Sequence, residues 1–565
     1  MLLSVCSLLL LCPSALTQQP NASLLTAVPT DADGLIYCQN FGALRLRALQ
    51  NDWIGLLSSS EGAPLLGELE REFRMQTHSQ MSGIYAMADA TRGESVFFVG
   101  DSLAGFLTQA PAEREALTNA MRSWLPEANV EGLRQAVQSG DAQIEIGAWP
   151  ADGDSASPER IGHYAAFVNH PQMMGLFSAK DGETLLKGIE TSLSNMGTDH
   201  RSALVQQFEA ARESTPSTGG LEFFRDLSSL HDEAESMLKD AAEGMLPDPT
   251  GMLGLEANIW LHVVADVFPG RRVDCEAFLH IPKDTLAAKL ADTFSALPAT
   301  TPARTPKQLW SVAALQWDIS SFYSQLHAAY IEQAGEEALA SVDAGLEAAK
   351  AMTGVDVLEE VLGQLDGTFV VYSVESQRPP AAATADFMTY DEELDELGLT
   401  LGLKSGDMFL DAFERLIGST GLESEFDLEE IESTDVYTIQ FGSGGDLDNS
   451  AGVDIDGGLA FPPHAFILGF ARSTIERALR AENGDLNSSL LSDEVMLQAF
   501  NENQDACFIG CVSLKPLQLR HYRDLESPAA AEGTQAKPSA DVFESFLTCS
   551  VRRTPNGFRF RVGTR

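Results

Sequence analysis

An acidic loop near residue 450 has the composition of a calcium site. The segment GGDLDNSAGVDIDGG carries Asp446, Asp448, Asp454 and Asp456, and calcium prefers several carboxylate and carbonyl oxygens in a flexible turn. The spacing departs from the EF-hand loop, because Ala451 stands where a sharp-turn glycine is needed and no glutamate closes the loop. Glycine, aspartate and asparagine are also ordinary turn residues. We therefore predict a polar loop between two strands, and cation binding at Asp446–Asp456 is the alternative.

Five cysteines beyond the first 17 residues could bind metal or form disulfides. They are Cys38, Cys275, Cys507, Cys511 and Cys549. Cys507 and Cys511, in CFIGC, would point to the same face of a strand, but no further cysteine or histidine stands nearby at a spacing that zinc requires. We predict ordinary buried thiols, since free cysteine is commonly buried. In an exported chain, a disulfide from Cys549 to Cys507 or Cys511 is the alternative.

Pairs of histidine and acidic residues do not indicate a catalytic site. His163 and His170 flank YAAFVN, and at that odd spacing in a strand they would face opposite sides of the sheet, so we do not expect them to share a metal ion. His231 and Glu235 would share one face of a helix, which is the usual arrangement of a solvated surface pair.

The common catalytic and cofactor motifs are absent from the sequence. It has no GxxxxGK[ST] phosphate loop, no GxGxxG between a strand and a helix, no GxSxG elbow and no HExxH. We therefore assign no catalytic, cofactor-binding or metal-binding residue and no cofactor. Active sites can assemble from residues distant in the sequence, so an exported hydrolase with an unrecognised site between two units is the alternative.

The elements that must position all these residues recur along the chain. Asn40 and Asp318 each follow a strand-like segment and precede apolar residues at helical spacing, so both are expected helix N-caps. The stretch GHYAAFVNHPQMMGLFSAKDGETLLKGI, from Gly162, resembles GLAFPPHAFILGFARSTIERAL, from Gly458. Six such correspondences keep the same order at separations of 273 to 294 residues, which indicates a tandem duplication. Coincidence within a large α+β protein is the alternative.

Each repeated unit predicts an α+β fold with a mainly antiparallel sheet and helices against one of its faces. NIWLHVVADVFPGRRVDCEAFLHI and SFLTCSVRRTPNGFRFRVGT are predicted β-hairpins, with turns at Pro-Gly and Pro-Asn-Gly. We assign residues 24–298 to the first unit and 299–565 to the second. ALPATTPARTPKQ, at the join, predicts a linker or an extended segment that leads into the second unit. The segments near 378–398 and 526–541 predict surface loops.

The charge balance excludes some classes of partner. The chain of 565 residues has 82 acidic and 37 basic residues, a net charge of -45. Such a surface repels phosphate backbones and anionic lipid heads, which argues against nucleic-acid and peripheral-membrane roles. Solubility explains this acidity most simply, and binding of a cation or of a basic partner is the alternative.

The first 17 residues predict a signal peptide. Their apolar core of about twelve residues is too short to span a bilayer, and small residues precede Gln18. No later stretch reaches the roughly 18 apolar residues of a spanning helix, so we expect no integral span in the mature chain.

Three segments resemble a known family. VPTDADGLIYCQNFGAL, MTGVDVLEEVLGQLDGTFVVYSV and AFILGFARSTIERAL resemble an uncharacterised family of secreted bacterial proteins, the domain of unknown function 3352. The resemblance implies an exported, often repeated α+β module, and it brings no established activity and no catalytic residues. We expect a periplasmic or extracellular protein that is a non-catalytic binding or structural module, with an unknown protein or envelope component as partner.

Overall fold

The computed structural model describes most of the chain beyond residue 22. The described residues are 23–52, 90–111, 114–122, 125, 135–150, 161–198, 201–215, 217, 219–227, 254, 258–270, 272–374, 397–441, 455–513 and 546–564. The expected signal peptide (1–17), the segment near 526–541 and nearly all of that near 378–398 lie outside these ranges.

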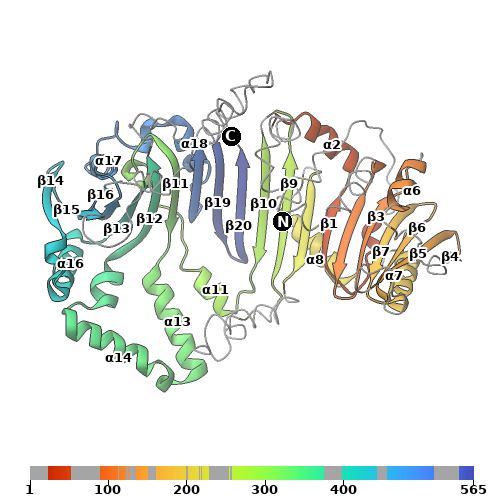
Figure 1. Cartoon of the computed structure of the whole chain (residues 1–565), viewed down its shortest axis with the longest axis horizontal. Helices are drawn as coiled ribbons and strands as arrows, with labels where there is room; N and C mark the ends of the chain where they lie inside the picture. Colours follow the sequence, from red (N-terminus) through yellow and green to blue (C-terminus); the bar gives the residue numbers. More distant parts are fainter. Residues whose placement is uncertain are drawn as a thin grey trace.

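Twenty strands form one antiparallel sheet across the described residues. Figure 1 shows how the strands follow one another across the molecule. Those before residue 300 are β1 (Ala32–Cys38), β2 (Ser95–Gly100), β3 (Leu103–Gln109), β4 (Gln135–Ser139), β5 (Ala142–Pro150), β6 (Ile161–Asn169), β7 (Met173–Ala179), β8 (Leu221–Asp226), β9 (Trp260–Val267) and β10 (Val273–His280). Those after it are β11 (Leu309–Gln316), β12 (Leu365–Val374), β13 (Leu397–Leu403), β14 (Asp427–Ile431), β15 (Thr434–Phe441), β16 (Ile455–Ala460), β17 (Ala465–Gly469), β18 (Phe508–Ser513), β19 (Phe546–Thr554) and β20 (Gly557–Thr564).

Hydrogen-bonded neighbours give the order of the strands in space. It is β4–β5–β6–β7–β3–β2–β1–β8–β9–β10–β20–β19–β18–β11–β12–β13–β17–β16–β15–β14. The predicted hairpins β9–β10 and β19–β20 are confirmed. The last strand of the chain therefore lies in the middle of the sheet, beside β10 (Figure 1).

The seam between β10 and β20 joins segments far apart in the sequence. Seven residue pairs run along it. The Val273 amide donates to Thr564 Oγ1 at 3.0 Å across a sequence separation of 291 residues. Arg559 Nε lies 3.3 Å from Glu276 Oε1, and the same guanidinium donates to the Ser214 carbonyl. Main-chain pairing and these side-chain contacts together join the two halves of the sheet.

Helices accompany the sheet in both parts of the chain, so the α+β class is confirmed. Those before residue 300 are η1 (Leu24–Ala27), α2 (Phe41–Leu49), α6 (Glu115–Arg122), α7 (Gly182–Asn195), α8 (Ala203–Ser214) and α11 (Leu286–Ala291). Those after it are α12 (Thr301–Arg304), α13 (Ile319–Ala334), α14 (Glu336–Thr353), η3 (Val357–Val361), η4 (Leu362–Gln364), α16 (Gly406–Thr420), η5 (Leu422–Glu425), α17 (Arg472–Glu482), η6 (Leu490–Ser492) and α18 (Glu494–Glu502). Within the described ranges, no helix combines the length and apolar character needed to cross a membrane.

Both predicted N-caps are confirmed. The Asn40 side chain accepts a hydrogen bond from the Ala43 amide at 2.9 Å and begins α2. Asp318 accepts from the Ser321 amide at 2.9 Å and begins α13. Each cap satisfies one of the amides that the first turn of a helix leaves without a partner.

Helices cover both faces of the sheet, so the prediction of helices against one face is wrong. Leu35 and Tyr37 of β1 enter the core that α7 and α8 complete. Cys38 points to the opposite face, where Leu44 of α2 covers it. Successive residues of a strand face opposite sides of the sheet. In β1 the residues on both sides are apolar, so helices must pack against each face.

The expected linker at the join is a packed segment. Residues 301–304 form the short helix α12, and Thr301 and Pro302 are buried. α12 packs against α17 and η6. Proline at the start of this helix costs no hydrogen bond, because the first amides have no helical partner in any case.

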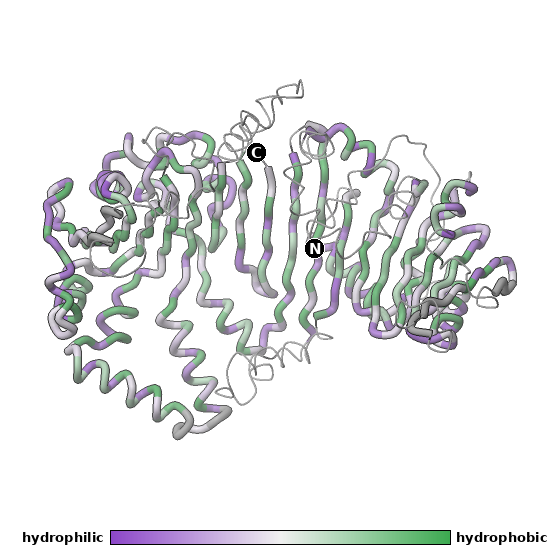
Figure 2. The backbone as a smooth tube through the Cα atoms, viewed as in Figure 1, coloured by the Kyte–Doolittle hydropathy of each residue, from purple (hydrophilic) through white to green (hydrophobic). Residues whose placement is uncertain are grey.

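A helical arm, residues 319–353, projects from the second part of the sheet. In Figure 1, α13 runs away from β11, and α14 returns toward α16 after a turn at Gly335. Wherever exposure is described along α13 and α14, no residue is buried. Figure 2 shows apolar and polar residues alternating along both helices.

Candidate functional site

The acidic loop predicted as a possible cation site falls largely outside the described residues. Asp446, Asp448 and Asp454 lie outside them, and Asp456 belongs to β16. Across the part of the chain that the structure describes, no group of three or more His, Cys, Asp or Glu side chains could hold a metal ion. Cation binding at this loop stays an untested alternative.

All five described cysteines are free thiols. β18 and β19 are neighbours, but the register places Cys549 opposite Gly510. Cys511 therefore points to the other face of the sheet, where it enters the second core. Cys507 donates its thiol to the Val551 carbonyl at 3.2 Å. The alternative of a disulfide from Cys549 is wrong, and the prediction of buried thiols is confirmed for Cys38, Cys275, Cys507 and Cys511.

The two histidines considered for metal ligation occupy different positions along the chain. His163 lies within β6, and His170 follows the end of that strand. His170 Nδ1 accepts a hydrogen bond from the Gln172 amide at 3.2 Å, and its carbonyl accepts from Arg114 at 3.3 Å. Burial lowers the pKa of His170. His170 shapes a turn, and the predicted surface pair His231 and Glu235 lies outside the described residues.

A buried charged cluster was missed by the sequence analysis. His262 of β9 and Glu222 of β8 are 0% and 1% exposed, with Nε2 and Oε2 3.4 Å apart. Arg212 of α8 reaches the same oxygen at 2.8 Å, and its guanidinium lies over the Tyr37 ring. A lone histidine among apolar residues in NIWLHVVADV was the available signal. Neither His262 nor Glu222 can meet a substrate from solvent, so the cluster fastens α8 to the sheet.

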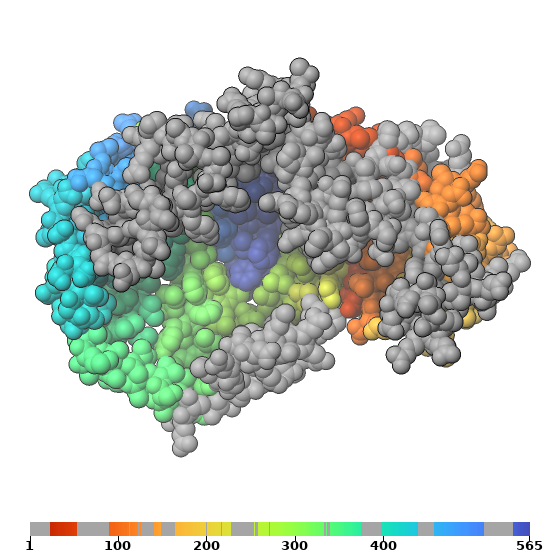
Figure 3. All heavy atoms as spheres, viewed as in Figure 1, coloured from red at the N-terminus to blue at the C-terminus, as the bar shows by residue number. Residues whose placement is uncertain are grey.

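Six exposed apolar side chains lie on the arm and on helices beside it, and we call this set the α14–α16 surface. They are Val342 and Met352 of α14, Val357 of η3, Met408 and Leu416 of α16, and Leu422 of η5. Their exposed fractions run from 38% at Val357 to 74% at Met352. α14, η3 and η5 each pack against α16. In Figure 3 these elements form the lower-left outline of the molecule, in green and cyan.

Acidic residues predominate in the segments that carry the α14–α16 surface. Residues 336–374 and 397–430 contain 16 aspartates and glutamates but only three lysines and arginines. The three basic side chains have partners within the same segments: Lys350 with Asp356, Arg415 with Glu360, and Lys404 with the Gly363 carbonyl. The segments that carry the six apolar side chains therefore have a strongly negative net charge, and their own three basic residues are engaged.

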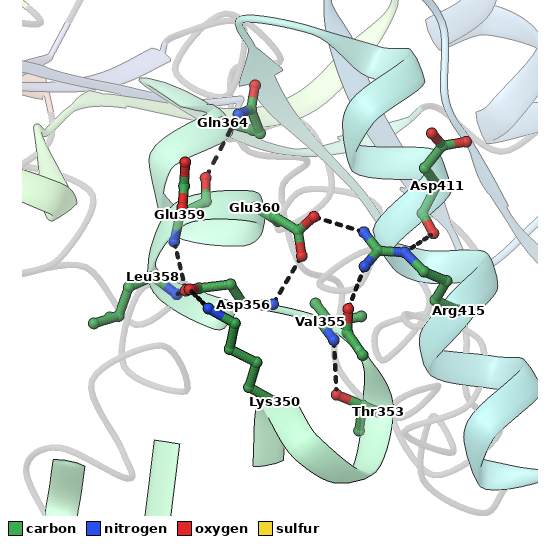
Figure 4. A network of polar contacts seen from close by, with 11 residues as sticks. Lys350, Thr353, Val355, Asp356, Leu358, Glu359, Glu360, Gln364, Asp411 and Arg415 are labelled. Carbon is green, nitrogen blue, oxygen red and sulfur yellow. Dashed lines mark hydrogen bonds and ion pairs between the residues drawn. The ribbon is translucent and has the colours of Figure 1, made fainter. Parts of the chain in front are cut away.

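A network of polar contacts holds the junction between α14, η3 and α16 (Figure 4). Lys350 Nζ donates to Asp356 Oδ2 at 2.8 Å, and Arg415 Nη2 donates to Glu360 Oε1 at 2.8 Å. Arg415 also donates to the Gly354 carbonyl. The hydrogen bonds from Lys350 and Arg415 hold the pKa values of Asp356 and Glu360 below their ordinary values. These contacts fix the end of α14 beside α16 and so fix the spacing of the apolar side chains on them.

Comparison with known proteins supplies no assignment. No family model matches the chain, and no curated protein matches it. One solved structure, described as the structure of crystal form I of TP0453, is 10% identical and covers 50% of this chain and 90% of its own, at a TM-score of 0.23. A likeness this low carries no argument about fold or function.

Proposed function

We propose that the chain is a non-catalytic binding module that works through the α14–α16 surface. The observation that carries the proposal is the exposure of its six apolar side chains, 38 to 74% each. Exposed apolar area costs about 25 cal/mol per Å² in water, and apolar patches rimmed by polar residues mark interaction sites. The buried pair His262 and Glu222 offers no competing site, because solvent does not reach either side chain.

We also propose that the chain is a tandem duplication, with units at residues 24–298 and 299–565. The neighbour order of β1 to β10 recurs among β11 to β20 when each label is raised by ten. The equivalent caps Asn40 and Asp318 support the same view. The resemblance to the domain of unknown function 3352 agrees with a repeated module. An experimental structure in which the two halves do not superpose would refute it.

Export is part of the same proposal and rests on the first 17 residues. N-terminal sequencing of the protein from its native cells should begin near Gln18, in a periplasmic or extracellular fraction. Recovery of Met1 from the cytoplasm would refute export.

An exported hydrolase with a site between the two units is the second candidate function. The described part of that junction is a strand pair, β10 with β20, and its charged side chains Arg559 and Glu276 engage each other. This arrangement supports a structural role at the junction, so the binding module is preferred.

A photocrosslinking amino acid at position 352 tests the binding function. We expect one defined protein adduct in the native envelope fraction from Met352, which is 74% exposed. We expect none from Leu486, which is 58% exposed and lies between α17 and η6. Purified protein should be screened in parallel for hydrolysis, with and without calcium. Turnover abolished by replacing a single histidine or aspartate would overturn the proposal in favour of the hydrolase.

A further inference from the structure

The arm has less packing than helices of its length need. α14 has 18 residues, and in proteins most helix stability comes from packing of an apolar stripe against the rest of the chain. Leu339, Val342, Leu346 and Ala349 form such a stripe at intervals of three and four residues. Val342 is nevertheless 46% exposed, and the other three are half-buried. The stripe is therefore only partly used within the chain.

We infer that the α14–α16 surface binds a basic amphipathic helix of a partner protein, an inference that rests on the proposed binding function. The surface is itself built of helices in contact, and the side-chain ridges of two such helices accept the ridges of a third. The apolar face of the partner would cover Val342, Met352 and Leu416. Burial there removes apolar area from water, which is the main favourable contribution to such association.

Charge complementarity determines the chemistry of the partner. Residues 336–374 and 397–430 contain 16 acidic residues and only three basic residues, all engaged. One of the acidic residues, Glu429, pairs with Arg472 from outside these segments. Glu347, Asp407 and Asp411 are exposed on α14 and α16. Lysines and arginines on the polar face of the partner would pair with them, whereas a second copy of this acidic chain would be repelled.

Two methionines suit the surface to a helical ligand. Met352 and Met408 are 74% and 50% exposed. Methionine is unbranched and flexible, so it adapts to apolar side chains of different shape. The side chains that touch the ligand can therefore adjust, while the junction of Lys350 and Arg415 keeps their helices in place.

Designed peptides test the inference on the full mature chain. The probe is a fluorescent peptide matched to the 18 residues of α14, with leucine on one helical face and lysine on the other. One comparison peptide has the same composition in an order without an apolar face, and another replaces lysine by glutamate. In fluorescence anisotropy we expect the probe to bind at least about tenfold more tightly than either. Its affinity should fall between about 0.05 and 0.5 M salt, because salt screens the carboxylates.

Surface variants locate the binding. Met352→Glu and Leu416→Glu should each weaken probe binding about tenfold or more, while Leu486→Glu, at a side chain 58% exposed, should leave it unchanged. Hydrogen exchange of α14 should slow when the probe binds and should not slow with the reordered peptide. Circular dichroism of each variant shows that it is folded.

The inference is overturned if the reordered peptide binds as well as the probe, since charge alone then explains the binding. It is also overturned if the probe does not bind, or if Met352→Glu and Leu416→Glu bind it unchanged. A dimer of the chain that Met352→Glu abolishes would assign the surface to a second copy and overturn it too. A crosslinked adduct at position 352 together with failure of the probe would leave the binding function standing and reject only this partner.

Discussion

Cys549 and Gly510 face each other across β18 and β19, and the sulfur occupies the space that a side chain at position 510 would need. A Cβ added at Gly510 would lie 2.5 Å from Cys549 Sγ. Gly510→Ala should therefore lower the free energy of unfolding by about 1–3 kcal/mol, as overpacking does, measured by urea denaturation.

The double variant identifies the cause of that loss. Cys549→Ala removes the sulfur, so adding it to Gly510→Ala should restore most of the lost stability. Gly345→Ala is the control, because a Cβ there meets nothing within 4 Å, and in a helix it should add about 0.5–1 kcal/mol. Equal losses in the single and double variants would show that the sulfur is not responsible.

Native thiols should differ in their reaction with iodoacetamide. Burial raises the pKa values of Cys38 and Cys511 to about 12, so at a pH of about 8 almost no reactive thiolate is present at either. Cys549, less completely buried, should be alkylated before them when peptides are analysed by mass spectrometry. Peptides joined by a disulfide, or equal rates at Cys511 and Cys549, would contradict the structure.

The same thiols give a stability change at alkaline pH. Their folded pKa values lie above the ordinary value of 9.0. The protonated thiols therefore stabilise the folded state below pH 9.0. This contribution to the free energy of unfolding is lost as the pH rises toward about 12. Cys511→Ala should reduce that loss.

Removal of the Glu222 carboxylate should destabilise the first core strongly. Glu222→Ala leaves His262 and Arg212 without the carboxylate that lies close to both. Breaking a buried charged pair costs up to about 3–5 kcal/mol, and the 31% exposure of Arg212 reduces that cost. Glu209→Ala removes the exposed partner of Arg201 and should cost less than about 1 kcal/mol. A difference below about 1 kcal/mol between the two variants in urea denaturation would refute the role of the cluster.

Acid should loosen the junction at the end of the arm. The pKa values of Asp356 and Glu360 are held below the ordinary 3.8 and 4.5, so their contribution is present above those values and is lost as the pH falls through the folded pKa values. Hydrogen-exchange protection of α14 should fall as the pH drops below about 4.5, before that of β10. Arg415→Gln should reduce this protection at neutral pH and weaken its dependence on acid. Unchanged protection of α14 in acid would contradict the prediction.

A glycine in the β14–β15 turn should stabilise the protein. Glu432 and Ser433 both have positive φ angles, 51° and 62°, in a two-residue turn that favours glycine. The Glu432 side chain pairs with Arg480, so Ser433→Gly is the clean substitution. It should raise the free energy of unfolding by about 1 kcal/mol, whereas Ser433→Val, with a branched side chain at the same φ, should lower it. A lower melting temperature for Ser433→Gly would contradict this reasoning.

Local features could be predicted from the sequence. Asn40 and Asp318 cap helices because a cap depends on a few adjacent residues. The closing hairpins followed from alternation and turn residues within one short stretch. The cover on both faces was missed because strict alternation in FRFRV was extended to strands such as β1, whose residues are apolar on both sides.

Features that depend on distant register could not be predicted. The alternative of a disulfide from Cys549 required β18 and β19 to be neighbours, but only the pairing of Cys549 with Gly510 decides which face each thiol occupies. The cluster of Glu222 and His262 also requires two strands and α8 to meet. The α14–α16 surface was missed for a similar reason. Whether an apolar side chain on a helix is exposed depends on the distant segments that pack against that helix.

The pairing of β10 with β20 also sets the order in which parts of the sheet can form during synthesis. The hydrogen bond from the Val273 amide to Thr564 can form only after Thr564, 291 residues later, has been synthesised. Synthesis at ~5–20 residues per second takes roughly 15–60 s over that distance. Throughout that delay β10 is an open strand edge, and such edges recruit strands from other molecules. Neighbouring unfinished chains can then pair with one another through β10. The yield of folded protein should therefore fall as the rate of synthesis in one compartment rises, and a chaperone that shields β10 should restore it.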